Sequence, residues 1–430
     1  METMGFPKGV MQRISGILLG CLAGVDVSSL KKHKKHLLAL AITLLFLVSA
    51  GCAVSNSEAG VSGGGPDDPA QQQLRYFGEF KDQYPDEYAS FMQGALLIEE
   101  DGIAHSHANL RNRVEQDPKI LEVGAACLSC KTYEFNELYT EYGAEIFYLP
   151  YAEITGKVAD MFSCRTCHAN GDPLSGADAT LVTYTTYAAE FLKTVDPQTA
   201  ACGQCHNTTC DYVRYIVQRE GVTLADLDPY RYGTSADALR QAGLEDNTTL
   251  YPDKELGVAI PYRAHADIEL FQGSHHQELG LTCVSCHMPY ETNAAGVQYR
   301  SHNASGSPLE SEAAMKSCLT CHEAQGISST IEMRAFVRER QAAIGTLEEE
   351  VTEGLALLRT LIIAAETEGT LDQVTLRKAK DCYVDATYYY TFQHAGADIP
   401  GGKVAHAPDR MYAYLEQSKS QVEEGLSLFS

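Results

Sequence analysis

Five short motifs between residues 127 and 322 carry cysteines whose spacing predicts chemistry. Each motif has two cysteines three positions apart, followed by histidine in four motifs and by lysine in the first. The motifs are Cys127-Leu-Ser-Cys130-Lys131, Cys164-Arg-Thr-Cys167-His168, Cys202-Gly-Gln-Cys205-His206, Cys283-Val-Ser-Cys286-His287 and Cys318-Leu-Thr-Cys321-His322. Chance would supply about 0.015 Cys-x-x-Cys-His motifs at this composition, so four of them indicate a function.

The spacing of these cysteines is typical of covalent haem attachment. Two thiols on one turn can form thioethers with both vinyl groups of a haem, and the next residue then lies beneath the iron as its proximal ligand. The alternatives are zinc sites, thioredoxin-like redox pairs and disulfides. Zinc would require the motifs to combine into tetrahedral sets, which leaves the following histidines unexplained, and redox pairs do not come in fives. The sequence therefore predicts five c-type haems.

The remaining histidines separate electron-transferring haems from a reaction centre. Bis-histidine ligation at four haems needs four distal histidines, and such irons have no vacancy for a substrate. Lys131 differs, because an amine must lose its proton before it binds a metal. If no side chain occupies the opposite face, a small molecule can bind at this iron. Outside the first 36 residues the histidines not yet assigned are His105, His107, His265, His275, His276, His302, His394 and His406.

The amino-terminal residues predict export from the cytoplasm. Four lysines within residues 31–35 precede an apolar run, 37–48, that is too short to span about 30 Å of hydrocarbon. Cys52 after Ala50-Gly51 is typical of a bacterial lipoprotein cleavage site, although Ser49 stands where an aliphatic residue is usual. Plain cleavage and a retained anchor are the alternatives. We expect an extracytoplasmic protein, lipid-anchored through Cys52 to the outer face of the cytoplasmic membrane.

The signal segment, 1–52, precedes three segments of different character. Residues 53–74 are small, polar and rich in glycine and proline, which predicts a flexible linker. A haem-binding catalytic region is expected at 75–325 and a long-helix region at 326–430. The whole chain has 33 basic and 57 acidic side chains, a net charge of −24, and cleavage before Cys52 makes it −28. This charge excludes nucleic acid as an expected partner, because it repels phosphate.

Apolar periodicity predicts long helices near the carboxyl terminus. No proline occurs in residues 309–399, and apolar side chains recur there at intervals of three and four: Ile344, Leu347, Val351, Leu355, Leu358 and Ile362. This pattern predicts an amphipathic helix of about 35 to 40 residues. Further helices are expected at 371–394 and 407–427. We therefore expect a mainly α fold, a multihaem cytochrome c fold with a haem-packed core and long carboxy-terminal helices. Cys210 and Cys382 lie outside the motifs and could form a disulfide.

The motifs resemble those of the pentahaem cytochrome c nitrite reductase family, whose members form ammonia. The resemblance rests on the lysine in the first of five motifs, on the segment Cys283-Val-Ser-Cys-His-Met-Pro-Tyr290 and on the helical last third, and it covers residue 75 to the end. It implies the six-electron reduction of nitrite to ammonium at the Lys131 haem. It also implies a membrane quinol-oxidising multihaem cytochrome as electron donor, and a homodimer formed through the long helices.

The same resemblance implies a distal ligand for each histidine-ligated haem. His302 corresponds to the distal ligand of the second haem, His406 to that of the fourth and His276 to that of the fifth. His105 is the first choice for the third haem, with His107 as the alternative. His275 and His394 are left without a role.

Three further residues are implied to act on the substrate. Arg111, twenty residues before Lys131, corresponds to the family's arginine, with Arg113 as the alternative. His265 corresponds to the catalytic histidine. Tyr212 aligns with the catalytic tyrosine only if three residues are inserted after the third motif. Many family members bind calcium nearby, but here Arg263 replaces an oxygen ligand with a cation, so calcium is expected to be absent.

Two other functions remain open at this stage. The first is reduction of another small oxyanion or of hydroxylamine, because the departures at Tyr212 and Arg263 fall in the pocket that selects the substrate. The second is a pure electron conduit between other proteins. Lys131 argues against a conduit, which gains nothing from an open iron.

Overall fold

The computed structural model describes most of the chain after residue 80. The described residues are 81–93, 106–116, 121, 124–159, 161–168, 176–211, 222–246, 250–261, 265–394 and 400–430. Four residues with predicted roles lie outside these ranges: Cys52, His105, Tyr212 and Arg263. The chain divides into two compact units, 1–64 and 65–430, and every described residue belongs to the second. Among the described residues, no helix is both long and apolar enough to cross a membrane.

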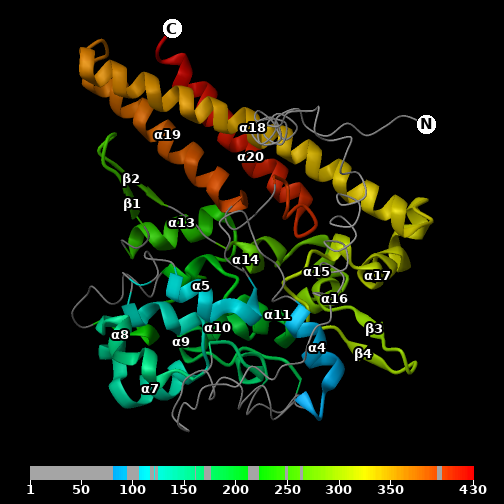
Figure 1. The fold of residues 1–430 in the computed structure, drawn as a ribbon. Coiled ribbons are helices and arrows are strands. Elements are labelled where there is room, and N and C mark those ends of the chain that lie inside the picture. Colours follow the sequence, from blue (N-terminus) through cyan, green and yellow to red (C-terminus); the bar gives the residue numbers. More distant parts are fainter. Residues whose placement is uncertain are drawn as a thin grey trace, which may run out of the picture. The chain divides into compact units, whose positions relative to one another are not determined.

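The described chain is mainly helical, as the sequence predicts (Figure 1). Two antiparallel hairpins interrupt the helices, with Leu250 opposite Pro261 in the first and Tyr290 opposite Arg300 in the second. The strands are β1 (Leu250–Asp253), β2 (Val258–Pro261), β3 (Tyr290–Thr292) and β4 (Gln298–Arg300). The helices before the last third are α4 (Pro85–Gln93), α5 (Leu110–Gln116), α7 (Glu134–Tyr142), α8 (Tyr151–Ile154), α9 (Val182–Tyr187), α10 (Ala189–Leu192), α11 (Pro197–Gly203), α13 (Ala236–Glu245), α14 (Asp267–Phe271), α15 (His275–Glu278), α16 (Cys283–His287) and α17 (Glu312–His322).

Three long helices form the carboxy-terminal third. They are α18 (Thr330–Glu368), α19 (Gln373–His394) and α20 (Pro408–Ser427), and α18 has the predicted length, with 39 residues. The side chain of Ser329 accepts a hydrogen bond from the Glu332 amide and so caps α18 at its start. Gly369, with a φ of 66°, ends it in the left-handed conformation that glycine adopts without steric cost.

The three long helices pack against one another along their apolar faces (Figure 1). Two glycines permit a close approach of α18 and α20. A Cβ at Gly354 would lie 2.5 Å from Val422, and one at Gly425 would lie 2.7 Å from Leu358. Cys382 of α19 is a buried free thiol at this contact, and the side chain of Cys210 is not among those described.

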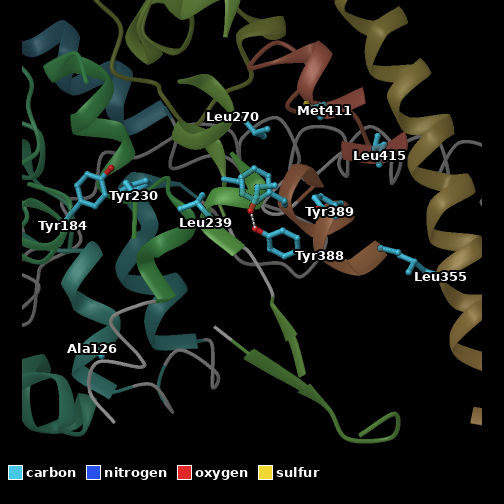
Figure 2. Packing of buried hydrophobic residues seen from close by; sticks show 14 of the residues in the cluster. Ala126, Tyr184, Tyr230, Leu239, Leu270, Leu355, Tyr388, Tyr389, Met411 and Leu415 are labelled. Atoms are coloured by element: carbon cyan, nitrogen blue, oxygen red, sulfur yellow. Dashed lines mark hydrogen bonds between the residues drawn. The ribbon is translucent and has the colours of Figure 1, made fainter. Parts of the chain in front are cut away.

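One hydrophobic cluster joins the long helices to the cysteine-motif region. Tyr388 of α19 donates a hydrogen bond to the Ala236 carbonyl of α13. Arg359 of α18 binds Asp253 of the first hairpin through two nitrogens, at 3.0 and 3.1 Å. The long helices therefore contribute to the core of the whole described unit. Figure 2 shows members of the cluster from both regions, namely Tyr184, Tyr230, Leu239, Tyr388, Tyr389, Leu355 and Leu415.

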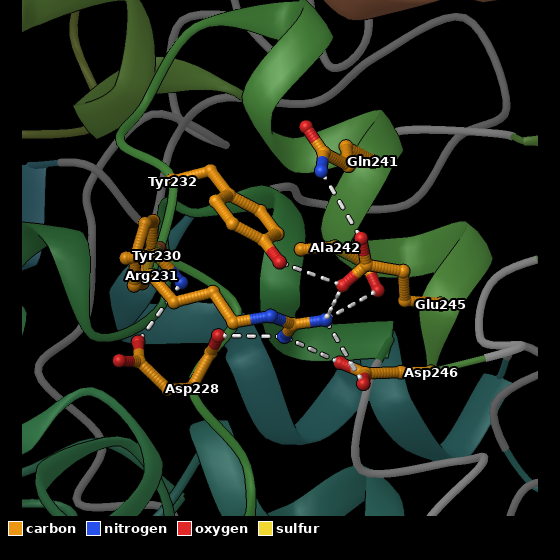
Figure 3. A network of polar contacts seen from close by, with 8 residues as sticks. All are labelled: Asp228, Tyr230, Arg231, Tyr232, Gln241, Ala242, Glu245 and Asp246. Atoms are coloured by element: carbon orange, nitrogen blue, oxygen red, sulfur yellow. Dashed lines mark hydrogen bonds and ion pairs between the residues drawn. The ribbon is translucent and has the colours of Figure 1, made fainter.

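A buried polar network supports the residues after the third motif. Glu269 of α14 is fully buried, and its Oε1 accepts hydrogen bonds from the Thr208 amide (2.9 Å) and the Tyr230 hydroxyl (2.9 Å). The neighbouring Arg231 fixes this turn to α13, since it donates to Asp246 at 2.8 Å and to Glu245 at 3.1 Å (Figure 3). Tyr230 is thereby held against Glu269. The same carboxylate binds Thr208, which lies two residues after His206 of the third motif.

The burial of Glu269 predicts a pH-dependent stability. Burial raises the pKa of Glu269 to about 7, from an ordinary value of 4.5. Between these values the unfolded chain loses the proton while the folded chain keeps it, so stability falls as pH rises from 4.5 to 7. The loss amounts to about 3 kcal/mol. We expect the melting temperature of wild type to fall between pH 5 and pH 8 more than that of Glu269→Gln. Parallel melting curves at both pH values would contradict this expectation.

Candidate haem sites and catalytic centre

The four histidine motifs lie on short helical turns. The fourth motif forms α16, the third lies at the end of α11 and the fifth at the end of α17. Asp196 caps α11 by accepting a hydrogen bond from the Gln198 amide at 2.9 Å. One helical turn brings the amide of His206 to 3.0 Å from the carbonyl of Cys202, and the second motif closes in the same way. The turn places two sulfurs and an imidazole on one side of the chain.

The lysine motif has a different backbone. It lies on a 3₁₀ helix, Gly124–Cys130, and the amide of Lys131 bonds to the Leu128 carbonyl at 3.0 Å. In the second and third motifs, the histidine amide instead bonds to the carbonyl four residues before it. The Lys131 side chain therefore leaves the motif from a tighter turn, with its Nζ 3.5 Å from the Cys130 sulfur.

The thiols of the motifs suit thioether formation. All ten motif cysteines are free, so none forms a disulfide within its motif or between motifs. Burial raises the pKa values of Cys167 and Cys286 to about 12. Among the described residues, the one group placed to hold a metal ion directly is His206, His265 and Asp267, and it contains no cysteine.

Each of the four motif histidines has a second imidazole at nearly the same distance. The ring centroids are 6.4 Å apart in His168 and His302, and 6.5 Å apart in His322 and His276. The other two pairs are both at 6.2 Å, His287 with His406 and His206 with His107.

These distances match two imidazoles on opposite sides of one iron. A metal–imidazole bond is about 2.0 Å long and a ring centre lies about 1.1 Å beyond the nitrogen, which gives about 6.2 Å between centres. Imidazoles must be neutral to bind a metal, and burial lowers the pKa of His107 to about 3 and that of His287 to about 4. The residues therefore fit four haems with two histidines each.

The ring contacts of His206 are relevant to the choice between His105 and His107 as the distal ligand of the third haem. His107 lies opposite His206, and it stacks on Phe162 with the ring centroids 4.3 Å apart. His105, the first choice from sequence, lies outside the described residues. Sequence spacing could not separate two histidines that are two residues apart, whereas the ring contacts favour His107.

Neighbouring motifs lie close enough to form a continuous series. The Cys205 sulfur of the third motif lies 2.9 Å from the Cys130 carbonyl of the first. The third motif also contacts the fourth, through the packing of α11 on α16, and α16 packs on α17 of the fifth. The sulfurs of Cys205 and Cys167 influence each other electrostatically, which places the second motif beside the third. The third motif thus adjoins the first, second and fourth.

His265 lies beside His206 of the third motif and has a strained backbone. Its φ of 55° is the one positive value among the described residues other than glycine. Its ring is 5.8 Å from that of His206, in an edge-on arrangement. Burial, and to a smaller extent the charges of His206 and Lys131, lower the pKa of His265 to about 4. Part of its side chain is nevertheless exposed. Such strain at a residue with predicted chemistry is typical of functional sites.

Arg111 is anchored by the chain around it. Its Nη2 donates to the carbonyls of Val158 (2.7 Å) and Ala159 (3.0 Å), and its Nη1 pairs with Glu115 at 3.1 Å. Its Nε is buried and has no hydrogen-bond partner. The carbonyls and the carboxylate thus hold the guanidinium group in place, while Nε is enclosed by the protein.

The two histidines without a predicted role have structural surroundings. The side chain of His275 is 79% exposed on α15. His394 ends α19, where its Nδ1 lies 3.3 Å from the buried Glu348 and its ring stacks on Tyr390. Sequence reasoning missed Asp267, Glu269 and Lys403, which no motif marks and which become visible as a group only through their contacts.

Comparison with known proteins gives both a family and a fold. A family model described as cytochrome c552 matches residues 102–428. The fold is similar to that of a cytochrome c nitrite reductase from Desulfovibrio desulfuricans, whose description stresses two calcium sites in the catalytic subunit. That match has a TM-score of 0.63 and 16% identity, over 83% of this chain and 86% of the other. An outer cell wall cytochrome, OcwA, matches 77% of this chain and 54% of its own with a TM-score of 0.39 and 17% identity.

Proposed function

The chain belongs to the cytochrome c552 family, the family of the cytochrome c nitrite reductases, and we propose that it reduces nitrite to ammonium. Family membership makes it an oxidoreductase with covalently bound c-type haems. The observation that carries the proposal is the contrast between the motifs. Each of the four histidine motifs has a partner imidazole at 6.2 to 6.5 Å, whereas the first motif carries a lysine in place of the histidine. His265, whose ring is 5.8 Å from that of His206, is left over once the four pairs are assigned.

This contrast assigns two tasks to different parts of the chain. We propose five haems, of which four have two histidine ligands and the fifth has Lys131 as its proximal ligand. When bound, the haems would pass on the six electrons that the electron donor supplies and would provide an iron for the substrate. The contacts of the third motif with three others support a branched route for electrons toward Lys131.

The side chains near Lys131 handle the oxygens of the substrate. His265 is proposed to donate a hydrogen bond to an oxygen and to supply protons as the N–O bonds break. Arg111 is proposed as a second donor through its guanidinium group, which Val158, Ala159 and Glu115 hold in place. Tyr212 remains a predicted third member of the site. In a protein of such negative charge, these cations would also attract an anionic substrate locally.

Turnover of nitrite by the isolated holoprotein tests this function. With reduced viologen as electron donor, we expect nitrite to disappear and ammonium to appear in equal amounts. Release of hydroxylamine, or turnover of hydroxylamine or sulfite alone, would favour the other reductases. If the protein has only six-coordinate low-spin haem and consumes no nitrite, it is an electron conduit.

The choice between His107 and His105 gives a separate prediction. We propose His107 as the distal ligand of the third haem, because its ring lies at the iron-spanning distance from His206. In His107→Ala we expect one low-spin haem to become high-spin, as seen by electron paramagnetic resonance. The matched variant His105→Ala is expected to keep all four low-spin signals. The reverse result would assign the ligand to His105.

The location of the protein, its electron donor and its oligomeric state are also proposals. Family members are periplasmic, and the signal segment supports export; we further propose lipid anchoring at Cys52. A membrane quinol-oxidising cytochrome is the proposed donor, and α18 to α20 are proposed to form a homodimer. The absence of calcium stays a prediction that rests on Arg263.

A further inference from the structure

We propose that Asp267 is a positioning residue shared by two haems, which forms a hydrogen bond with the proximal ligand of the third haem and lies within ion-pair distance of the distal ligand of the fourth. Its Oδ2 lies 3.2 Å from Nδ1 of His206, and its Oδ1 lies 3.5 Å from Nδ1 of His406. Lys403 completes the group, with its Nζ 2.9 Å from Oδ1. The inference rests on the ligand pairs proposed above.

The position of Asp267 is fixed by the backbone on both sides. Its amide bonds to the carbonyl of His265 at 2.7 Å, in a tight turn across Ala266 that directly follows the left-handed His265. The next amide, of Ile268, bonds to the carbonyl of His206 at 3.1 Å. The start of α14 is thus joined directly to the third motif, and the carboxylate cannot move away from His206 without breaking that contact.

The group around Asp267 differs from the surroundings of the other ligand histidines. Nδ1 of His302 faces the Arg300 carbonyl at 2.9 Å, and Nδ1 of His276 faces the Ala405 carbonyl at 2.9 Å. Nδ1 of His168 faces the Gly176 carbonyl at 3.1 Å. These partners are neutral, whereas the partner of His206 and His406 is a carboxylate. The ammonium group of Lys403, 2.9 Å from Oδ1, pairs with this carboxylate.

A carboxylate in this position changes the electronic character of a ligand. It accepts a hydrogen bond from Nδ1 of His206, which makes that imidazole a stronger donor to iron and stabilises the ferric state, and its negative charge 3.5 Å from His406 favours the ferric state of the fourth haem as well. Asp267 is therefore expected to lower the reduction potential of both haems together. Lys403 acts in the opposite direction through its positive charge. The third and fourth motifs are neighbours, so electrons can pass between their haems. One carboxylate shifts both reduction potentials in the same direction, and the difference between the two potentials therefore stays small.

Redox titration of the isolated holoprotein without nitrite tests this proposal. At pH 8, where the carboxylate is ionised, we expect Asp267→Asn to raise the midpoint potentials of two low-spin haems and leave the other two unchanged. Lys403→Met is expected to lower the same two potentials. The electron paramagnetic resonance signals of the same two haems should change in both variants. Asp267→Glu, which restores the charge, should return the potentials toward wild type.

A matched control is Asp253→Asn, because Asp253 is also bound to a cation from another helix, Arg359, but contacts no proposed ligand. It should leave all four potentials unchanged. A shift confined to one haem, or shifts of the same sign in Asp267→Asn and Lys403→Met, would overturn the proposal, since a general loss of structure moves both variants alike. Wild type without four low-spin signals would instead refute the ligand pairs. Absence of nitrite turnover would refute the proposed function and leave the potentials as evidence on Asp267.

Discussion

Replacement of Lys131 by histidine is expected to lower the rate of ammonium formation by about 100-fold, since the axial ligand is the strongest control that a protein has over a haem. The backbone adds a geometric reason. The Lys131 amide bonds to the Leu128 carbonyl, so this motif turns more tightly than the histidine motifs. A histidine at this position would leave the chain in a different direction and with a shorter reach. The measurement is nitrite turnover with reduced viologen, followed as ammonium.

The Lys131→His protein supplies its own controls. Haem content per chain should remain that of wild type, because Cys127 and Cys130 are unchanged. Reduction of the four low-spin haems by viologen should proceed as in wild type, because their ligands are distant in sequence and unaltered. A variant that keeps full ammonium production would show that the reaction takes place at another haem.

Replacement of His265 by asparagine is expected to lower kcat by about 100- to 1,000-fold, the usual effect of removing a general acid. Asparagine is the suitable substitute, because it tolerates the left-handed backbone that His265 adopts with its φ of 55°. The change therefore removes the imidazole without adding backbone strain. Steady-state kinetics with nitrite measures the effect, and the low-spin haem spectrum checks that the ligand pairs persist.

The neighbouring His275 provides the matched control for His265. Its side chain is 79% exposed and it begins the helix that also carries the proposed ligand His276. His275→Asn should turn over nitrite at the wild-type rate. Equal losses in the two variants would mean that the first effect came from disturbance of this region and not from a missing proton donor.

The two proposals about haem ligands and about Asp267 involve the same element. α14 begins one residue after Ala266, and its first residue, Asp267, lies between the third and fourth motifs. His265 precedes it and lies beside His206 of the third motif. A short segment thus contributes to the proposed catalytic centre and to the electron route that would supply it. Variants at His265 should therefore be checked for altered haem potentials, and variants at Asp267 for altered turnover.

The sequence by itself determined the features that depend on local chemistry. Covalent haem attachment follows from five motifs of two cysteines and a ligand, because these residues must lie on a single turn. The three long helices follow from apolar periodicity, and α18, α19 and α20 agree closely with the predicted ranges. The family could be identified for the same reason, since the lysine of the first motif is a local signal.

Tertiary structure alone decided which distant residues meet. His406 lies 119 positions after His287 and yet their rings are 6.2 Å apart; the family resemblance implied this pair, but no pattern within the sequence itself predicts it. The contact of His107 with His206 and the group of Asp267, Lys403 and two proposed ligands likewise come from tertiary packing. Motif chemistry is written in consecutive residues, whereas the second ligand of an iron and the charges around it come from wherever packing brings another segment of the chain.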